Sequence, residues 1–122
     1  MATQKTYLWP VYTLKVKQYE IWAVEWNNNP RNIRLVLIIQ GNHLNDAEPV
    51  SYIVCPLSKQ ITPRCFLLRM YLYLWGIGTY TILINQVYTL NAETLVKKVG
   101  ELNEEELKKM RRNIALILGF II

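Results

Sequence analysis

The stretch that most constrains the fold runs from Arg31 to Asn45, with the sequence RNIRLVLIIQGNHLN. Its centre, Leu35 to Ile39, is apolar at every position and rich in branched side chains, and turn-forming residues follow it. A short continuous apolar run bounded in this way favours a strand that is buried on both faces. Such a strand needs partners on both edges, so the chain is predicted to build a sheet around it.

Arg34 is the unusual residue at the entrance of this strand. By strand alternation its side chain shares a face with Val36 and Ile38, which are expected in the core. An unpaired guanidinium is not stable in a core, so we expect Arg34 at the rim, where it meets a protein acceptor or an anion. An ordinary surface or ion-paired arginine is the alternative interpretation.

The bulk composition predicts one cytoplasmic domain. A chain of 122 residues with 52% apolar residues is large enough for a single core and too apolar for disorder. The longest apolar run, Cys65 to Gly78, contains Arg69 and is too short to cross a bilayer, and residues 1–17 lack a signal-peptide pattern. Two cysteines and one histidine, His43, form neither a disulfide framework nor a metal-ligand set, so we expect no metal and no cofactor.

Charge and aromatic content point to a polyanionic partner. The net charge is +5, and the chain has 4 tryptophans and 8 tyrosines. Exposed rings beside basic groups can stack unpaired bases, although rings that simply fill a small core are the alternative.

The order of local patterns predicts an α+β fold, a small antiparallel β-barrel with a short helix and a C-terminal helix. After an N-terminal extension at 1–17, the expected strands are Tyr19–Trp26, Leu35–Ile39, Ser51–Leu57, Arg64–Trp75 and Tyr80–Leu90. In the first of these strands, alternation predicts that Trp22, Val24 and Trp26 share one face. A short helix is expected from Asn91 to about Gly100. The last helix follows a capping box of Asn103 and Glu106, with an apolar stripe of Leu107, Met110, Ile114, Ile117 and Leu118.

Four segments of the chain match motifs of one known family, and they follow one another in the same order as in that family. Gln18–Trp26 stands where that family has Arg-Gly-Asp-Ile-Trp-x-Val-x-Leu, and Arg34–Asn42 with Asn45 stands for Arg-Pro-Val-Leu-Val-Ile-Gln-Asn-Asp…Asn. Ile53–Ser58 matches a strand ending in Pro-Leu-Thr, and Ile82–Asn91 matches Ile-Leu-x-x-Gln-Ile-Arg-Thr-Ile-Asp. In this order and spacing the chain resembles the MazF/PemK family of type II toxins, with residues 18–122 as the toxin domain.

The resemblance implies an SH3-like, CcdB-like barrel fold. It also implies a metal-independent endoribonuclease, an mRNA interferase that cleaves single-stranded RNA by attack of the ribose 2′-hydroxyl. The family's catalytic arginine and threonine fall on Arg34 and Ser58. The residues expected to contact RNA are Trp26, Asn28, Arg31, Lys59, Gln86 and Tyr88. The implied partners are a second copy of the chain in a homodimer and an acidic, MazE-like antitoxin, with no membrane contact.

Departures from the family pattern keep two other functions open. Ser58 replaces threonine, Tyr88 replaces arginine, and the loop from Asn27 to Ile33 is shorter than in the family. These changes fit a catalytically degenerate protein that only binds an antitoxin. A CcdB-like gyrase poison is the other alternative, because the Trp-Gly-Ile ending of such poisons occurs internally at Trp75-Gly76-Ile77.

Overall fold

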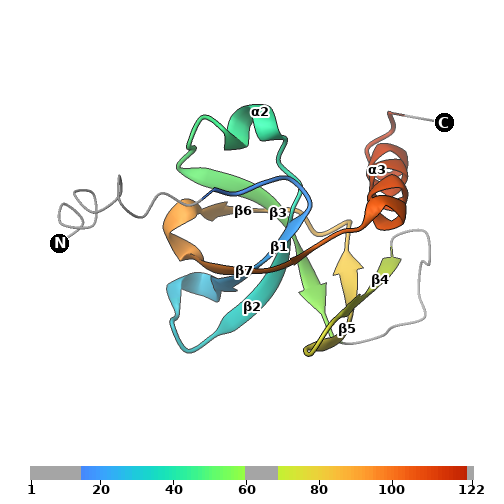
Figure 1. The fold of residues 1–122 in the computed structure, drawn as a ribbon. Helices are drawn as coiled ribbons and strands as arrows, with labels where there is room; N and C mark the ends of the chain where they lie inside the picture. Colours follow the sequence, from blue (N-terminus) through green and yellow to red (C-terminus); the bar gives the residue numbers. More distant parts are fainter. Residues whose placement is uncertain (1–14, 60–68, 121–122) are drawn as a thin grey trace.

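The computed structural model describes residues 15–59 and 69–120, which form a curled antiparallel sheet with a helix at its C-terminal end (Figure 1). The strands are β1 Glu20–Glu25, β2 Ile33–Ile38, β3 Ser51–Ser58, β4 Arg69–Leu74, β5 Gly78–Leu83, β6 Tyr88–Asn91 and β7 Leu95–Glu101. The helices are α2 Asn42–Asn45 and α3 Glu104–Ile117. The predicted fold class is therefore confirmed.

Strand β3 joins the two parts of the sheet. The strand order is β4-β5-β3-β2-β1-β7, and β6 also pairs with β3. The first part of β3 pairs with β2 and β6, whereas its last two residues, Leu57 and Ser58, pair with Ile82 and Thr81 of β5. The end of β3 thus leaves β2 and continues into a small β3–β5–β4 sheet (Figure 1).

Alternation along β1 builds two cores. Ile21 packs with Leu37 of β2 in one cluster, while Trp22 and Val24 pack with Val36 in the other. Trp26 lies at the edge of this second cluster, so the predicted sharing of a face by Trp22, Val24 and Trp26 is confirmed.

The single strand expected over Tyr80–Leu90 is wrong. β5 ends at Leu83, a turn follows in which the Gln86 N–H donates to the Leu83 carbonyl over 3.0 Å, and β6 starts at Tyr88. The interruption has a long-range cause, because β5 pairs with the end of β3 and β6 pairs with its beginning. The chain must turn to move from one position to the other.

The helix expected from Asn91 is also wrong. Ala92–Thr94 form one 3-10 turn, closed by a 2.7 Å hydrogen bond from Thr94 Oγ1 to the Asn91 carbonyl, and β7 follows directly. β7 pairs with the free edge of β1, as shown by Leu95 opposite Val24. Pairing with β1 therefore outweighs the local capping signal, as often happens with weak helix propensity.

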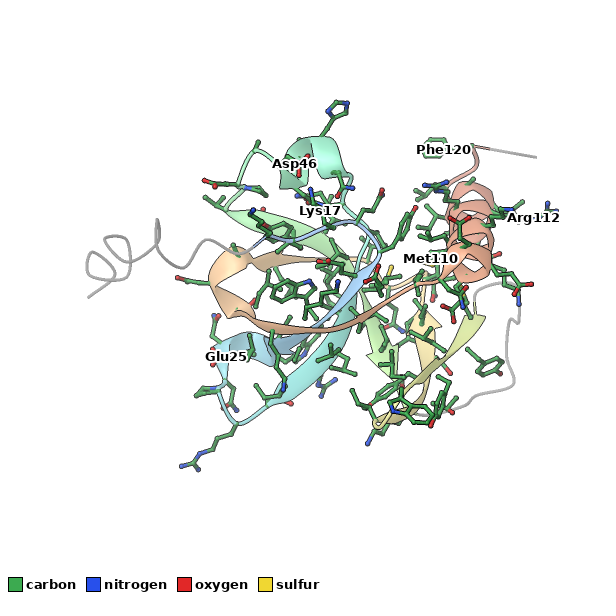
Figure 2. All side chains as sticks on the ribbon, in the orientation of Figure 1. Lys17, Glu25, Asp46, Met110, Arg112 and Phe120 are labelled. Atoms are coloured by element: carbon green, nitrogen blue, oxygen red, sulfur yellow. The ribbon has the colours of Figure 1, made fainter. Side chains whose placement is uncertain are left out.

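The C-terminal helix follows its prediction closely. Asn103 and Glu106 form the expected capping box, with hydrogen bonds of 2.8 and 2.9 Å. Met110 is fully buried against the sheet (Figure 2), while Arg112 is exposed. Leu118 was expected on the apolar stripe, but α3 ends at Ile117 and Leu118 is 57% exposed.

Parts of the sequence predictions lie outside the described residues. Of the strand expected over Arg64–Trp75, only β4 is described, and Cys65 is not. Of the extension at 1–17, only the last residues are described, where Val16 is 2% exposed in the second core. Within the described ranges, no helix combines the length and the apolar character needed to cross a bilayer.

Candidate functional site

An open cavity of about 390 Å³ lies where β2, β3 and the β5–β6 turn meet. Six of the eight residues predicted from the sequence line it. They are Trp26, Arg34, Ser58, Lys59, Gln86 and Tyr88. The structure therefore brings together residues from four separate parts of the chain.

Strand register explains why Arg34 and Ser58 face the same cavity. Val36 pairs with Pro56; Arg34 lies two residues before Val36 in β2, and Ser58 lies two residues after Pro56 in β3. On its other edge Arg34 pairs with Val24 of β1. Side chains two residues apart in a strand point to the same side, so Arg34 and Ser58 share the face of the Val36–Pro56 pair, and both line the cavity.

Arg34 is held without a carboxylate. It is exposed at the rim, as predicted, and its Nε donates a long 3.4 Å hydrogen bond to Asn32 Oδ1. Its guanidinium lies over the Trp26 ring, 5.4 Å from the centroid. None of the ion pairs among the described residues involves Arg34. Its charge therefore remains available to a bound anion.

Aromatic rings and a second cation complete the rim. Trp26 and Tyr88 meet edge to face, with 5.1 Å between centroids and an interplanar angle of 81°. Lys59 follows β3, and its Nζ lies 5.7 Å from the centre of the Tyr80 ring. Cations beside partly exposed rings can bind both the phosphate and the base of a nucleotide.

Ser58 and Gln86 supply the neutral polar groups. Ser58 is half-buried as the last residue of β3 and is fixed by its pairing with Thr81. Gln86 is exposed in the β5–β6 turn. A hydroxyl and a carboxamide each offer both a donor and an acceptor to a ligand.

Cys55, one residue behind the cavity wall in β3, does not provide a nucleophile. It is fully buried, and its Sγ lies 3.7 Å from the Ile84 carbonyl oxygen. Burial raises the pKa of the Cys55 thiol to about 12. The thiol is therefore neutral near pH 7, and a neutral thiol is a poor nucleophile.

Two predicted residues do not line the cavity. Asn28 and Arg31 are exposed in the loop between β1 and β2, next to Trp26 in sequence. Asn28 has a left-handed backbone with φ of 56°, and the Arg31 N–H donates to Asn29 Oδ1 over 2.9 Å. The loop turns their side chains into solvent beside the cavity.

The sequence did not predict that Tyr80 belongs to the site. Tyr80 lines the cavity and supports Lys59, but it does so from β5, whose register with β3 has no local signal. In the described residues, no three His, Cys, Asp or Glu side chains are grouped in a way that could hold a metal ion.

Comparison with known proteins decides the family. A family model for PemK-like, MazF-like toxins of type II toxin–antitoxin systems matches residues 17–118. The chain belongs to this family. The resemblance inferred from motif order is thus confirmed, and the MazF-like match covers every residue of the cavity. No curated protein sequence matches the chain.

Solved structures of MazF-like proteins share the fold. An endoribonuclease in complex with its cognate antitoxin from a mycobacterial species has a TM-score of 0.71 and 15% identity, covering 88% of this chain and 98% of that one. MazE–MazF from Deinococcus radiodurans has a TM-score of 0.69 and 15% identity, covering 87% of this chain and 97% of that one. The Mycobacterium tuberculosis toxin MazF-mt6 has a TM-score of 0.68 and 13% identity, covering 82% of this chain and 96% of that one. At these identities the likeness establishes the fold.

Proposed function

We propose that this MazF-like protein is a metal-independent endoribonuclease that cleaves single-stranded RNA in the cavity between β2, β3 and the β5–β6 turn. The observation that carries the proposal is the convergence of Arg34 and Ser58 on one cavity with Trp26, Lys59 and Tyr88. Family membership supports it, and two of the structural neighbours are described as endoribonucleases.

The chemistry needs few protein groups. The ribose 2′-hydroxyl attacks the adjacent phosphorus, the bond to the 5′-oxygen breaks, and negative charge accumulates on the phosphoryl oxygens in between. The Arg34 guanidinium stabilises this charge, because it is fixed near the site and carries no internal carboxylate partner. The Ser58 hydroxyl positions the phosphate or relays a proton.

The remaining site residues bind the strand. Trp26 and Tyr88 offer ring faces to a base, and Lys59 attracts the phosphate backbone. Gln86 is placed to hydrogen-bond a base edge or a phosphate. Asn28 and Arg31, which lie outside the cavity lining, contact the strand where it leaves the cavity.

A cleavage assay on mixed-sequence single-stranded RNA in EDTA tests the assignment. Arg34→Ala should lower the rate by about 10²–10³-fold, the scale of losing one preorganised charge-stabilising donor. Arg34→Lys should recover only part of this, because an ammonium ion cannot form a two-pronged contact. Ser58→Ala should also slow cleavage, and Ser58→Thr should preserve or raise it.

Arg111→Ala is the matched control, since Arg111 is exposed on α3 and its guanidinium lies over the Tyr19 ring, away from the cavity. Its cleavage rate should equal that of wild type. Equal cleavage by Arg34→Ala and wild type would show that the site assignment is wrong. If wild type binds an antitoxin but cuts nothing, the degenerate binding protein is the right function. The gyrase-poison alternative gains no support, because Trp75-Gly76-Ile77 lie at the β4–β5 turn.

The proposed partners are a second copy of the chain and an antitoxin, in the cytoplasm. Neighbours with this fold include an endoribonuclease with its cognate antitoxin and MazE–MazF. With a net charge of +5 on this chain, the antitoxin segment that binds it should be acidic, and the affinity should fall as salt rises. An affinity that does not change with ionic strength would contradict an electrostatic contact.

A further inference from the structure

The outer face of the β4–β5 hairpin carries a row of exposed rings that the cleavage site does not use. Along β4 the side chains alternate: Leu72 and Leu74 are 2% and 6% exposed in the core, whereas Tyr71 and Tyr73 are 53% and 62% exposed. Trp75, which follows β4, continues the row at 90% exposure. Solvent-exposed aromatic rows of this kind indicate a surface that binds something.

This row lies on the same face of the sheet as Ser58. Ser58 pairs with Thr81 of β5, and Thr81 pairs with Tyr71 of β4. One step along the hairpin, Thr79 pairs with Tyr73. Because paired residues share a face, the side chain of Ser58 and the row of rings project to the same side. The hairpin turn also lies at the same end of the small sheet as the end of β3 (Figure 1).

The two outer rings are arranged so that each keeps a free face. Tyr73 and Trp75 are 6.5 Å apart between centroids, with an interplanar angle of 83°. They come from alternate positions of the chain, about 6.8 Å apart along a strand. A base can therefore stack on one ring without excluding a base from the other.

Charge around this face favours a nucleic acid. The sequence from Pro49 to Ala92, which contains β3, the whole β4–β5 hairpin and β6, has no Asp or Glu. Lys59 lines the cavity directly after β3, and Thr79 adds an exposed hydroxyl opposite Tyr73. At the Tyr71 end of the row, α3 adds three cations, Lys108, Lys109 and Arg112, against the two carboxylates of Glu105 and Glu106, so the charge beside the row is net positive.

From these observations we infer that the outer face of the β4–β5 hairpin is a second RNA-binding surface. Bases of the single strand outside the cleavage cavity stack there on Tyr73 and Trp75. The inference rests on the proposed ribonuclease function, because the occupant is identified by continuity with the cavity that holds Ser58. It makes the substrate a strand several nucleotides longer than the cavity can hold.

The test is binding of single-stranded, mixed-sequence 2′-O-methyl oligonucleotides, which cannot be cleaved because their 2′-oxygen is blocked. Wild type should bind long oligonucleotides more tightly than short ones. The double variant Tyr73→Ala/Trp75→Ala should lose about tenfold in affinity per ring for the long ones, and nothing for the short ones. Tyr73→Phe/Trp75→Phe, which keeps both rings, should bind like wild type.

Kinetics give a second measurement on cleavable RNA. The double alanine variant should raise KM for long RNA while leaving kcat unchanged, since Arg34 and Ser58 are untouched. Val50→Ala removes an 85% exposed apolar side chain that is not on the hairpin and should change neither value.

The outcomes separate the two proposals. Full affinity of the double alanine variant for long oligonucleotides would overturn the inference while leaving the ribonuclease intact. Loss of antitoxin binding or of self-association, with oligonucleotide affinity unchanged, would also overturn it, because the face would then belong to a protein partner. A wild type that neither binds nor cuts RNA would instead refute the proposed function.

Discussion

The Arg34 guanidinium lies 5.4 Å above the Trp26 ring, and Tyr88 meets the same indole edge to face at 5.1 Å. Arg34 is therefore oriented by a ring and by one long hydrogen bond to Asn32, not by an acidic side chain. An acidic partner would neutralise the charge of Arg34, whereas a ring orients the cation and leaves its charge available to an anion.

The first prediction concerns Trp26. Trp26→Ala should lower kcat about two- to fivefold, the size expected from losing an exposed cation–π contact, because Arg34 then samples other rotamers. It should also raise KM through loss of a base-stacking surface. Trp26→Phe, which keeps an aromatic ring, should retain values of kcat and KM close to those of wild type. A steady-state assay on short RNA measures this, and an unchanged kcat in Trp26→Ala would show that the backbone alone positions Arg34.

How much of the fold the sequence predicts depends on how local each signal is. The capping box of Asn103 and Glu106 and the alternation of β1 are complete within a few residues, and both predictions are confirmed. The break that separates β6 from β5, and the strand β7, were missed because β6 and β7 are each defined by a distant partner, β3 for one and β1 for the other. Their own sequences are short and carry competing turn and capping signals.

The candidate site shows the same division. Motif resemblance indicated Arg34 and Ser58, but it did not indicate that Arg34 would lie over Trp26 or that Tyr80 would support Lys59. Those contacts depend on the register between β2, β3 and β5 and on the conformation of the β1–β2 loop. Neither is fixed by the residues that take part.

The second prediction concerns Tyr19, which has a left-handed backbone with φ of 69° where the family motif has glycine. Its ring is 8% exposed and lies under Arg111, 5.8 Å from the guanidinium carbon. Tyr19→Ala and Tyr19→Gly both lose the ring, yet Tyr19→Gly should be the more stable by about 1 kcal/mol, since glycine adopts positive φ without strain. Chemical denaturation measures the difference. If Tyr19→Ala were more stable than Tyr19→Gly, as alanine usually is relative to glycine, the left-handed backbone at this position would be contradicted.

The third prediction concerns Thr81, which is 2% exposed between Ser58 and Tyr71 in the small sheet. Its Oγ1 is buried and has no hydrogen-bond partner among the described residues. Thr81→Val replaces this hydroxyl with a methyl group of similar size and should stabilise the fold by about 1 kcal/mol. Thr81→Ser, which keeps the hydroxyl and loses a methyl, should destabilise it by a similar amount. Thermal unfolding of the two variants measures these changes in stability. A destabilised Thr81→Val would show that the Thr81 hydroxyl has a hydrogen-bond partner.

The fourth prediction concerns Lys98, whose Nζ lies 3.0 Å from Glu101 Oε1 and 3.1 Å from Glu20 Oε2. Hydrogen bonds to Glu101 and then Glu20 raise the pKa of Lys98, although burial opposes them. A raised lysine pKa stabilises the fold fully below the ordinary value of 10.5, and this stability is lost as pH rises through the folded-state value.

Lys98→Met should therefore be less stable than wild type at neutral pH, because it leaves the buried Glu20 carboxylate without its cation. The difference should shrink as pH rises above 10.5. Glu101→Gln is the control and should cost little, since the Glu101 side chain is 68% exposed. A difference between wild type and Lys98→Met that persists unchanged at high pH would mean that packing of the lysine stem, not its charge, is responsible.

The last prediction concerns assembly. The end of α3 leaves Leu116, Leu118 and Phe120 exposed by 37%, 57% and 76%, with Phe120 beyond the end of the helix (Figure 2). A two-fold homodimer that includes this end of α3, or the strands beside it, would cover these side chains. Light scattering at micromolar concentration should therefore show a dimer. Leu118→Glu should weaken it by about tenfold or more, because a carboxylate would be buried without a partner.

Leu44→Glu is the matched control on α2, where Leu44 is 58% exposed, and it should leave the dimer intact. A monomeric wild type would contradict the dimer itself, whereas a dimer equally strong in Leu118→Glu would move the interface away from the end of α3.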